Sequence, residues 1–371
     1  MPLYLTEDQA MLRDSAREFM AAEGAIAKQL RHWRDRNCKD GFGHGLWKQF
    51  GEMGFTGILV DEADGGLGLG NVEAGIVLEE IGRNLTPSPF LITAVAVVEA
   101  LRGSPLRERW LPGILSGDTV AALAVDEGPK HRPEAVAMQA DRSGNGFRLT
   151  GRKQFVVQGA SADFLVVAAK AAEGLTLFAV EKDANGLAIE GVRLADSSIG
   201  ARIDFEGVEV DADAVIGEVG QGEAILRRVL AAGRAGAASE MVGLGSAAMD
   251  MTVDYLKQRK QFGRLIGEFQ ALQHRSAHLY SELEIARSAT LKAQQLLDEG
   301  SEEAEAMVSV AKAKAGRTST LAVQEGVQMH GGIGMTDEYD IGLYMKRDRV
   351  LNELFGDANY HADKLARLNG Y

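Results

Sequence analysis

The sequence has almost none of the residues that build disulfide frameworks and thiolate metal sites. Its one cysteine, Cys38, excludes a disulfide within the chain and any site with several thiolate ligands. The seven histidines are scattered along the chain and form no HExxH motif. We therefore expect no metal site, and we expect Cys38 to be a spare thiol.

Long hydrophobic runs and basic clusters are also missing. No apolar run reaches the roughly 18 residues that a membrane-spanning helix needs. The N-terminus, MPLYLTEDQAMLRDSAREF, is acidic and amphipathic, with neither an apolar signal core nor an Arg-rich presequence. The formal net charge of −13 argues against general binding of a nucleic-acid backbone. These absences predict a cytoplasmic protein that binds neither membranes nor nucleic acids. They do not exclude a local basic pocket for a phosphorylated ligand.

What the chain does contain is a helical region, then a β region, then a second helical region. Its 371 residues exceed the usual size of one domain. Residues 1–118 have helical periodicity, and Thr6 before an acidic first turn predicts a helix start there. Residues 119–220 have short β-type runs between Gly or Asn turns. Residues 221–371 are helical again, and the stretch 232–249 is rich in Gly, Ala and Ser, which lets a neighbouring helix or a ligand approach its backbone closely. The predicted fold class is mainly α with a central antiparallel β domain. The expected strands are 119–125, 147–150, 154–157, 164–168, 175–180 and 204–210.

A glycine-rich stretch at residues 65–70 could be mistaken for a dinucleotide-binding loop. Its spacing is GGxGxG rather than GxGxxG, and no βαβ unit follows it. A tight turn is the better interpretation, because glycine adopts positive φ without steric cost.

Two C-terminal segments carry the chemical signal, RKQFG at residues 259–263 and QMHGGIG at residues 328–334. Each residue alone is better explained as a surface charge, a core aromatic or a turn glycine. Together they offer a guanidinium fork for a phosphate, a ring face, amide donors and acceptors, and backbone open to an anion. The residues in that order are Arg259, Phe262, Gln270, Gln328, Gly331 and Gly332.

These motifs, in this order behind a helix–β–helix layout, resemble the acyl-CoA dehydrogenase family along essentially the whole chain. The resemblance implies an N-terminal helical domain (1–118), a β-barrel or sandwich (119–220), a C-terminal four-helix bundle (221–371), and FAD as cofactor. It also implies an FAD site shared between subunits, and hence a dimer or a tetramer arranged as a dimer of dimers. The residues expected to hold FAD are Arg259, Gln261, Phe262, Gln270, Gln328, Gly331 and Gly332.

Within the family, the sequence is most similar to the small subunit of pimeloyl-CoA-type dehydrogenases. The strings that carry this similarity are DYLKQRKQFG, FQALQHR, HGGIGMT and LFGD. Such proteins work beside a larger homologous subunit, so a heteromeric enzyme is implied.

The implied reaction removes a proton from Cα of an acyl-CoA and transfers a hydride from Cβ to the flavin. The proton needs a carboxylate base whose pKa is raised in a dry site. An electron-transferring flavoprotein would then reoxidise the FAD.

The carboxylate that the resemblance leads us to expect is absent. The family's usual Glu falls on Gly356, and the position that a minority of the family uses falls on Gly233. Asp357, adjacent to the usual position, is the foremost substitute, and Glu240 and Glu353 are weaker ones. The backbone N–H of Gly356 can still bind the thioester oxygen, because that needs no side chain.

Further departures surround the expected active site. The flavin-facing Trp-Ile-Thr segment reads Phe155-Val156-Val157 here, so an aromatic surface is kept and a hydroxyl donor is lost. A β-domain loop of the family reads DEGPKH at residues 126–131, and Ala358 and Tyr360 replace the usual Thr and Gln. Arg234 is a candidate partner for a substrate carboxylate.

Three hypotheses follow. The chain is a dehydrogenase whose base is displaced to Asp357, or a structural subunit that completes the FAD site of a catalytic partner, or a flavin oxidase on the same scaffold. The acyl group of the substrate depends on pocket shape, which no motif reports.

Overall fold

A computed structural model describes residues 3–371 and divides the chain into two compact units. The first unit combines the N-terminal segment up to Arg31 with Asn71–Thr86 and Arg234–Tyr371. The second contains His32–Gly70 and Pro87–Gly233. The division by residue number into 1–118, 119–220 and 221–371 stays a prediction. No helix among residues 3–371 is long and apolar enough to cross a membrane.

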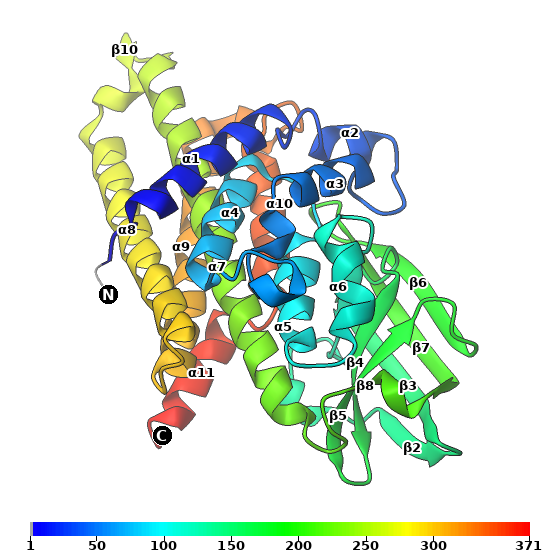
Figure 1. The fold of residues 1–371 in the computed structure, drawn as a ribbon. Helices are drawn as coiled ribbons and strands as arrows, with labels where there is room; N and C mark the ends of the chain where they lie inside the picture. The colour runs from blue at the N-terminus through cyan, green and yellow to red at the C-terminus, as the bar shows by residue number, and fades with distance from the viewer. Residues whose placement is uncertain (1–2) are drawn as a thin grey trace. The chain divides into compact units, whose positions relative to one another are not determined.

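The first unit is helical, and the helices of its C-terminal part form a bundle (Figure 1). At its N-terminal end, Thr6 caps the first helix by accepting from the Gln9 N–H, and the Gln9 side chain returns to the Thr6 N–H. The predicted helix start is therefore confirmed. The helices are α1 (Glu7–Ala22), α4 (Asn71–Asn84), α7 (Gly222–Gln258, which enters this unit at Arg234), α8 (Gln270–Asp298), α9 (Ala304–His330), α10 (Ile341–Glu353) and α11 (Ala358–Leu368).

Two glycines allow α4 and α7 to touch backbone to backbone. A Cβ on Gly243 would lie 1.9 Å from the Glu79 carbonyl oxygen, and one on Gly82 would lie 2.1 Å from the Glu240 carbonyl oxygen. Any larger residue would force the helices apart, since real Cβ atoms do not approach this closely. The Gly- and Ala-rich stretch of α7 is thus explained by helix packing.

The second unit places short helices beside a sheet. Its helices are α2 (Leu30–Asp35, mostly in this unit), α3 (His44–Glu52), α5 (Val98–Leu101) and α6 (Arg107–Leu115), with a π-helical segment at Phe90–Val97. The glycine-rich stretch at residues 65–70 is a turn, with positive φ at Gly65 and Gly68, as its spacing predicts.

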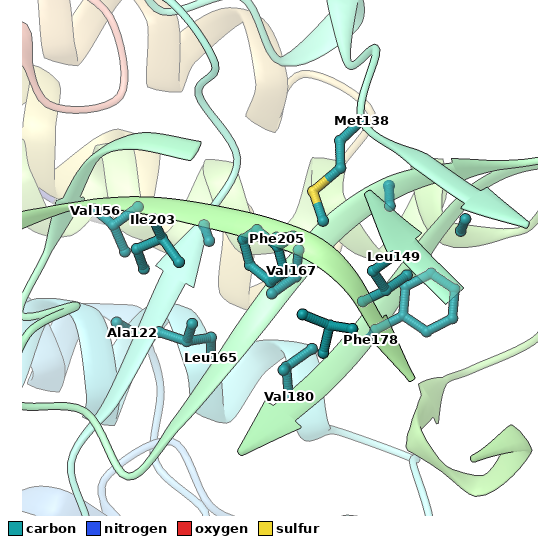
Figure 2. Close-up of a cluster of buried hydrophobic side chains, with 14 of the residues drawn as sticks. Ala122, Met138, Leu149, Val156, Leu165, Val167, Phe178, Val180, Ile203 and Phe205 are labelled. Carbon is teal, nitrogen blue, oxygen red and sulfur yellow. The ribbon is translucent and has the colours of Figure 1, made fainter. Parts of the chain in front are cut away.

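The sheet has eight strands in the order β6-β7-β3-β2-β4-β5-β8, with β1 paired to β4. Its buried face carries a cluster of aliphatic and aromatic side chains from most of the strands (Figure 2). Phe147, Phe178 and Phe205 are buried in this cluster. The strands are β1 (Ala121–Ala124), β2 (Gln139–Ser143), β3 (Gly146–Val157), β4 (Phe164–Ala171), β5 (Gly174–Glu181), β6 (Leu187–Arg193), β7 (Ile199–Val210) and β8 (Val215–Ile216).

The sheet departs from the expected strands in three ways. Residues 147–150 and 154–157 belong to one strand, β3, which continues through a register shift opposite β7. β2 and β6 are additional strands. β2 is mostly polar, and the apolar residues of β6 are half-buried or exposed and are interrupted by Glu190 and Gly191, so neither strand has a continuous buried apolar run. β1 pairs in parallel with β4, whereas the sequence led us to expect antiparallel pairing throughout.

Candidate functional site

The RKQFG motif forms an exposed β-hairpin between α7 and α8. β9 (Lys260–Gln261) pairs with β10 (Arg264–Leu265), and the turn residues Phe262 and Gly263 have φ of 54° and 80°. Positive φ at both positions is the geometry of a type I′ turn, which Asn and Gly adopt more readily than Phe. The Phe262 side chain is 91% exposed. A strained, exposed aromatic at a hairpin tip is well placed to contact a ligand or another subunit.

The QMHGGIG motif lies at the C-terminal end of α9. Gln328 is exposed in the last turn, Gly331 ends the helix with φ of 65°, and a 3₁₀ turn follows at Gly331–Met335. A Cβ placed on Gly331 or Gly332 would meet no atom within 4 Å. The backbone beside both glycines is therefore open to a ligand.

The structure brings both motifs and Gln270 to one end of the bundle. The rings of Tyr255 and His330 stack with centroids 4.4 Å apart, which joins the end of α7 to the end of α9. Arg275 near the start of α8 pairs with Glu325 of α9 at 2.6 Å. The hairpin and Gln270, the first residue of α8, lie in the chain between Tyr255 and Arg275. They are therefore at the same end of the bundle as these two contacts (Figure 1). Arg259, Gln261 and Phe262 thus share this end with Gln328, Gly331 and Gly332.

A second cluster surrounds Gly356, where the expected base is missing. The corner between α10 and α11 has positive φ at Phe355 (60°) and at Gly356 (99°). A Cβ on Gly356 would lie 2.4 Å from Cδ1 of Tyr360, so the Tyr360 ring fills the space of a side chain at that position. The Gly356 N–H donates to the Glu353 carbonyl at 3.3 Å, a long bond.

Three buried basic groups hold this corner. Arg234 Nε donates to the Phe355 carbonyl at 3.1 Å, and its Nη2 lies 3.2 Å from the Tyr360 hydroxyl. Lys312 Nζ donates to the carbonyls of Leu351 and Gly356, both at 3.0 Å. His361 Nε2 lies 3.1 Å from the Phe355 carbonyl.

Burial shifts the protonation of this cluster toward the neutral forms. Desolvation, helped by the charge of Arg234, lowers the pKa of Lys312 to about 7. Desolvation, with the charges of Arg234 and Lys312, lowers the pKa of His361 to about 2. At neutral pH the His361 ring is neutral and its Nε2 proton is donated to the corner.

The three carboxylates considered as substitutes for the missing base each have a structural contact. Asp357 is the N-cap of α11, and its Oδ1 accepts from the Tyr360 N–H at 2.8 Å. Glu240 is buried and pairs with Arg347 at 2.7 Å. Glu353 pairs with Arg349 one helical turn away, also at 2.7 Å. Each contact engages one oxygen of the carboxylate and holds the side chain in a structural role.

Phe155 and the 126–131 loop lie in the second unit. Phe155 has φ of 53° at the register shift in β3. The loop is held by a contact of His131 Nδ1 with the Asp126 carboxylate at 2.9 Å and by an ion pair of Lys153 with Glu127 at 2.7 Å. Lys153 is wholly buried, and desolvation lowers its pKa.

Sequence reasoning missed Lys312 and His361. In the string AKAKAG, a lysine is expected to face solvent. One signal was present, because Lys312 lies one helical turn from Val308 and Gly316, on the apolar face of α9. For His361 the signal is similar, because it lies one helical turn from Ala358 and Leu365 on one face of the amphipathic helix α11.

Comparison with known proteins agrees with this architecture. The signature described as "Acyl-CoA dehydrogenase, N-terminal domain" matches residues 6–118, and "Acyl-CoA dehydrogenase, C-terminal domain" matches residues 220–368. Cyclohex-1-ene-1-carbonyl-CoA dehydrogenase of Geobacter metallireducens is 31% identical over 96% of both chains. The mitochondrial isovaleryl-CoA dehydrogenase of Solanum tuberosum is 34% identical over 83% of this chain and 78% of its own.

A solved structure supports the same assignment. A variant of the steroid acyl-CoA dehydrogenase Tcur3481-Tcur3483 superposes with a TM-score of 0.90, at 29% identity and over 98% of both chains. The family of the chain is shown by the two domain signatures and by relatives above 30% identity over 83% and 96% of the chain. The helix–sheet–bundle fold agrees with it. The chain belongs to the acyl-CoA dehydrogenase family, a family of FAD-binding oxidoreductases that act on CH–CH bonds.

Proposed function

We propose that this chain is an FAD-binding subunit of a heteromeric acyl-CoA dehydrogenase, and that a larger homologous subunit supplies the proton-abstracting carboxylate. The enzyme would catalyse α,β-dehydrogenation of an acyl-CoA thioester. The observation that carries the proposal is the contrast between an exposed Phe262 hairpin and a Gly356 corner whose side-chain space Tyr360 fills. The hairpin is free to contact a cofactor, while the corner leaves no room for a base at position 356.

The end of the bundle that carries the β9–β10 hairpin offers the kinds of groups that bind FAD. Arg259 would pair with a phosphate, Phe262 would cover a ring, and the open backbone at Gly331 and Gly332 would face the diphosphate. Gln261, Gln270 and Gln328 would supply amide hydrogen bonds. Bound FAD would accept the hydride from Cβ. Phe155 stays a proposed contact of the flavin ring.

The separation of the two clusters supports a site shared between subunits. Lys312 contacts the Gly356 corner, and His330 contacts the hairpin end, 18 residues later on α9. At about 1.5 Å per residue, the two ends are roughly 27 Å apart along the helix. A dimer of dimers, in which a hairpin serves the neighbouring subunit's site, accounts for this distance.

On the substrate side, the buried cations keep the Phe355–Gly356 corner in place. Arg234 and Lys312 fix the carbonyls of Phe355 and Gly356, so Arg234 has a positioning role rather than contact with a substrate carboxylate. A Gly356 N–H that binds the thioester oxygen would exchange its 3.3 Å bond to Glu353 for a stronger one. An electron-transferring flavoprotein is the proposed acceptor of the electrons.

The competing function is an independent dehydrogenase that uses Asp357. For that role the carboxylate would leave the α11 cap, which costs about 1 kcal/mol. A flavin oxidase is a third outcome, and it would release hydrogen peroxide in step with substrate loss.

The deciding experiment restores the missing base after making room for it. The purified chain is titrated anaerobically with short, branched and ring-bearing acyl-CoAs, and loss of flavin absorbance is followed. We expect no bleaching for the wild type, for Gly356→Glu or for Tyr360→Ala. The double variant Gly356→Glu/Tyr360→Ala should bleach, because the introduced carboxylate then has space beside the corner. Bleaching of the wild type that disappears in Asp357→Asn would overturn the proposal in favour of the independent enzyme.

A further inference from the structure

The segment that joins α9 to α10 is tied by one arginine to the N-terminal part of the first unit. Arg31 donates from Nε and Nη2 to the same oxygen of Asp340, Oδ1, at 3.0 and 2.6 Å. Its Nη1 lies 3.5 Å from Oδ2 of Asp337. All three residues belong to the first unit, although the two aspartates are 309 and 306 positions away from Arg31 in the sequence. The contact therefore fastens the segment that follows the QMHGGIG motif.

The side chain of Asp340 is directed to Arg31 rather than to its own helix. Asp340 is the N-cap residue of α10, where an aspartate normally accepts from the first backbone N–H groups and contributes about 1 kcal/mol. Within the part of the chain that the structure describes, its side chain accepts no cap hydrogen bond. Short charge-assisted hydrogen bonds such as the one from Arg31 are the stronger kind. The arginine therefore decides where the carboxylate of Asp340 lies.

The other end of the segment is held by aromatic packing. His330 is 3% exposed, and its ring stacks on Tyr255 and lies 4.8 Å from the ring of Tyr339, measured between centroids. Most residues from 331 to 338 are exposed. The conformation of the Gly331–Met335 turn therefore relies largely on the contacts that hold the two ends of the segment.

Arg31 also balances the negative charge beside the turn. Three carboxylates lie within residues 337–340, and Arg31 pairs with two of them while its own side chain is 21% exposed. A diphosphate bound at the open backbone of Gly331 and Gly332 would be repelled by carboxylates that lack a compensating cation. The ion pairs therefore reduce the repulsion that an anionic ligand meets at this turn.

We propose that Arg31 is a positioning residue for the cofactor site at the Gly331–Met335 turn. This inference rests on the proposed function, in which the open backbone of the turn receives the diphosphate of FAD. Arg31 acts through Asp340 and Asp337, by holding the turn in its binding conformation and by neutralising the adjacent carboxylates. Ordering a loop costs conformational entropy, so a ligand binds more tightly to a loop that is already ordered.

The test measures the FAD affinity of the purified chain, stripped of flavin, by the change in flavin fluorescence. We expect Arg31→Ala to bind FAD about tenfold more weakly than the wild type, and Arg31→Lys, which keeps the charge, to lie between them. In an Asp340→Ala background, Arg31→Ala should weaken binding by less than about threefold, because its main partner is already gone. Arg13→Ala is the matched control, since Arg13 pairs with its neighbour Asp14 at 2.7 Å and should leave the affinity unchanged.

Hydrogen exchange of the flavin-free chain separates positioning from a general loss of stability. In Arg31→Ala the amides of residues 331–340 should exchange faster, whereas those of α4 and α8 should keep their rates. Equal acceleration across the first unit would mean that Arg31 only stabilises the fold, and it would overturn the proposal. If Arg31→Ala does not fold, Arg31→Lys and Asp340→Asn, which are smaller changes, decide by the same two measurements.

Two results would overturn the inference and leave the proposed function standing. One is an FAD affinity of Arg31→Ala within about twofold of the wild type, and the other is an undiminished effect of Arg31→Ala in the Asp340→Ala background. If the wild-type chain binds no FAD, the proposed function fails, and this role of Arg31 fails with it. The wild-type measurement thus distinguishes the two failures.

Discussion

At the scale of single residues, the Gly356 corner shows how one aromatic ring constrains its neighbour. Gly356 is held at positive φ, and Tyr360 lies where a Cβ would go. A side chain at 356 therefore meets two separate penalties, one from the backbone and one from the ring.

Gly356→Ala should lower the free energy of unfolding by about 1–3 kcal/mol, because alanine at this φ is strained and its Cβ overlaps Tyr360. In a Tyr360→Ala background the same substitution should cost less, since the overlap is gone and the backbone strain alone remains. Urea unfolding of the two single variants and the double variant gives the coupling. Strict additivity would show that the ring does not restrict position 356.

His361 should make stability depend on pH. Its folded pKa is lowered to about 2 by burial and neighbouring cations, while an unfolded histidine has a pKa near 6.5. Between these values the unfolded chain binds the extra proton. Stability from this group is thus complete above about pH 6.5 and falls by up to about 1.4 kcal/mol per pH unit below it.

Urea unfolding at pH 7, 6 and 5 checks this, with His361→Gln as the matched control. Glutamine keeps a donor for the Phe355 carbonyl and does not titrate. The difference in unfolding free energy between wild type and variant should shrink as the pH falls. A constant difference across the range would mean that His361 titrates equally in both states.

At the scale of elements, the β9–β10 hairpin combines local strain with exposure. Phe262→Asn should relieve the turn, since Asn favours the type I′ conformation, and should change the free energy of unfolding by less than about 0.5 kcal/mol. If the ring contacts FAD as proposed, the same substitution should reduce the flavin bound per chain. The ratio of flavin to protein absorbance measures this, and Tyr280→Asn, at an exposed position on α8, is the control. Full flavin retention in Phe262→Asn would remove Phe262 from the proposed site.

The α4–α7 contact makes a second prediction at this scale. Gly243→Ala should destabilise the first unit by about 2–3 kcal/mol or more, because the new methyl group would meet the Glu79 carbonyl at 1.9 Å. Gly342→Ala, near the start of α10, is a matched control, since its Cβ would make an ordinary 3.6 Å contact. That control should be neutral or slightly stabilising through helix propensity. Thermal unfolding followed by circular dichroism separates the two, and a tolerated Gly243→Ala would show that the helices can move apart cheaply.

At the scale of the whole molecule, sequence patterns predicted the order of helices and sheet and the family. They identified the Thr6 helix start and most of the apolar strands, because burial and capping leave local periodic signals. They could not find β2, whose residues are mostly polar, or β6, whose apolar residues are half-buried or exposed. Both strands are defined by pairing with their neighbours.

The candidate site was likewise predicted only in part from the sequence. Residues of RKQFG and QMHGGIG were recognised from short strings, and the structure gathers them at one end of the bundle. The Tyr360 ring over Gly356 depends on the backbone angle of a single residue, and the burial of Lys312 depends on the packing of α9 against α10 and α11. The position of the ring is not encoded in local composition, and the burial of Lys312 is signalled only by its place on the apolar face of α9.

The division into two discontinuous units has a consequence for synthesis on the ribosome. The second unit is complete in sequence once Gly233 has been made, whereas the first unit still lacks its largest segment. Because domains fold as units while the chain emerges, the sheet-containing unit should fold first. At that stage α1 and α4 still lack the C-terminal helices against which they pack. Nascent chains stalled after the whole of α7 should then resist protease within 32–70 and 87–233 and be cut within 6–22 and 71–84. Protection of both segments at that length would show that the two units instead fold together.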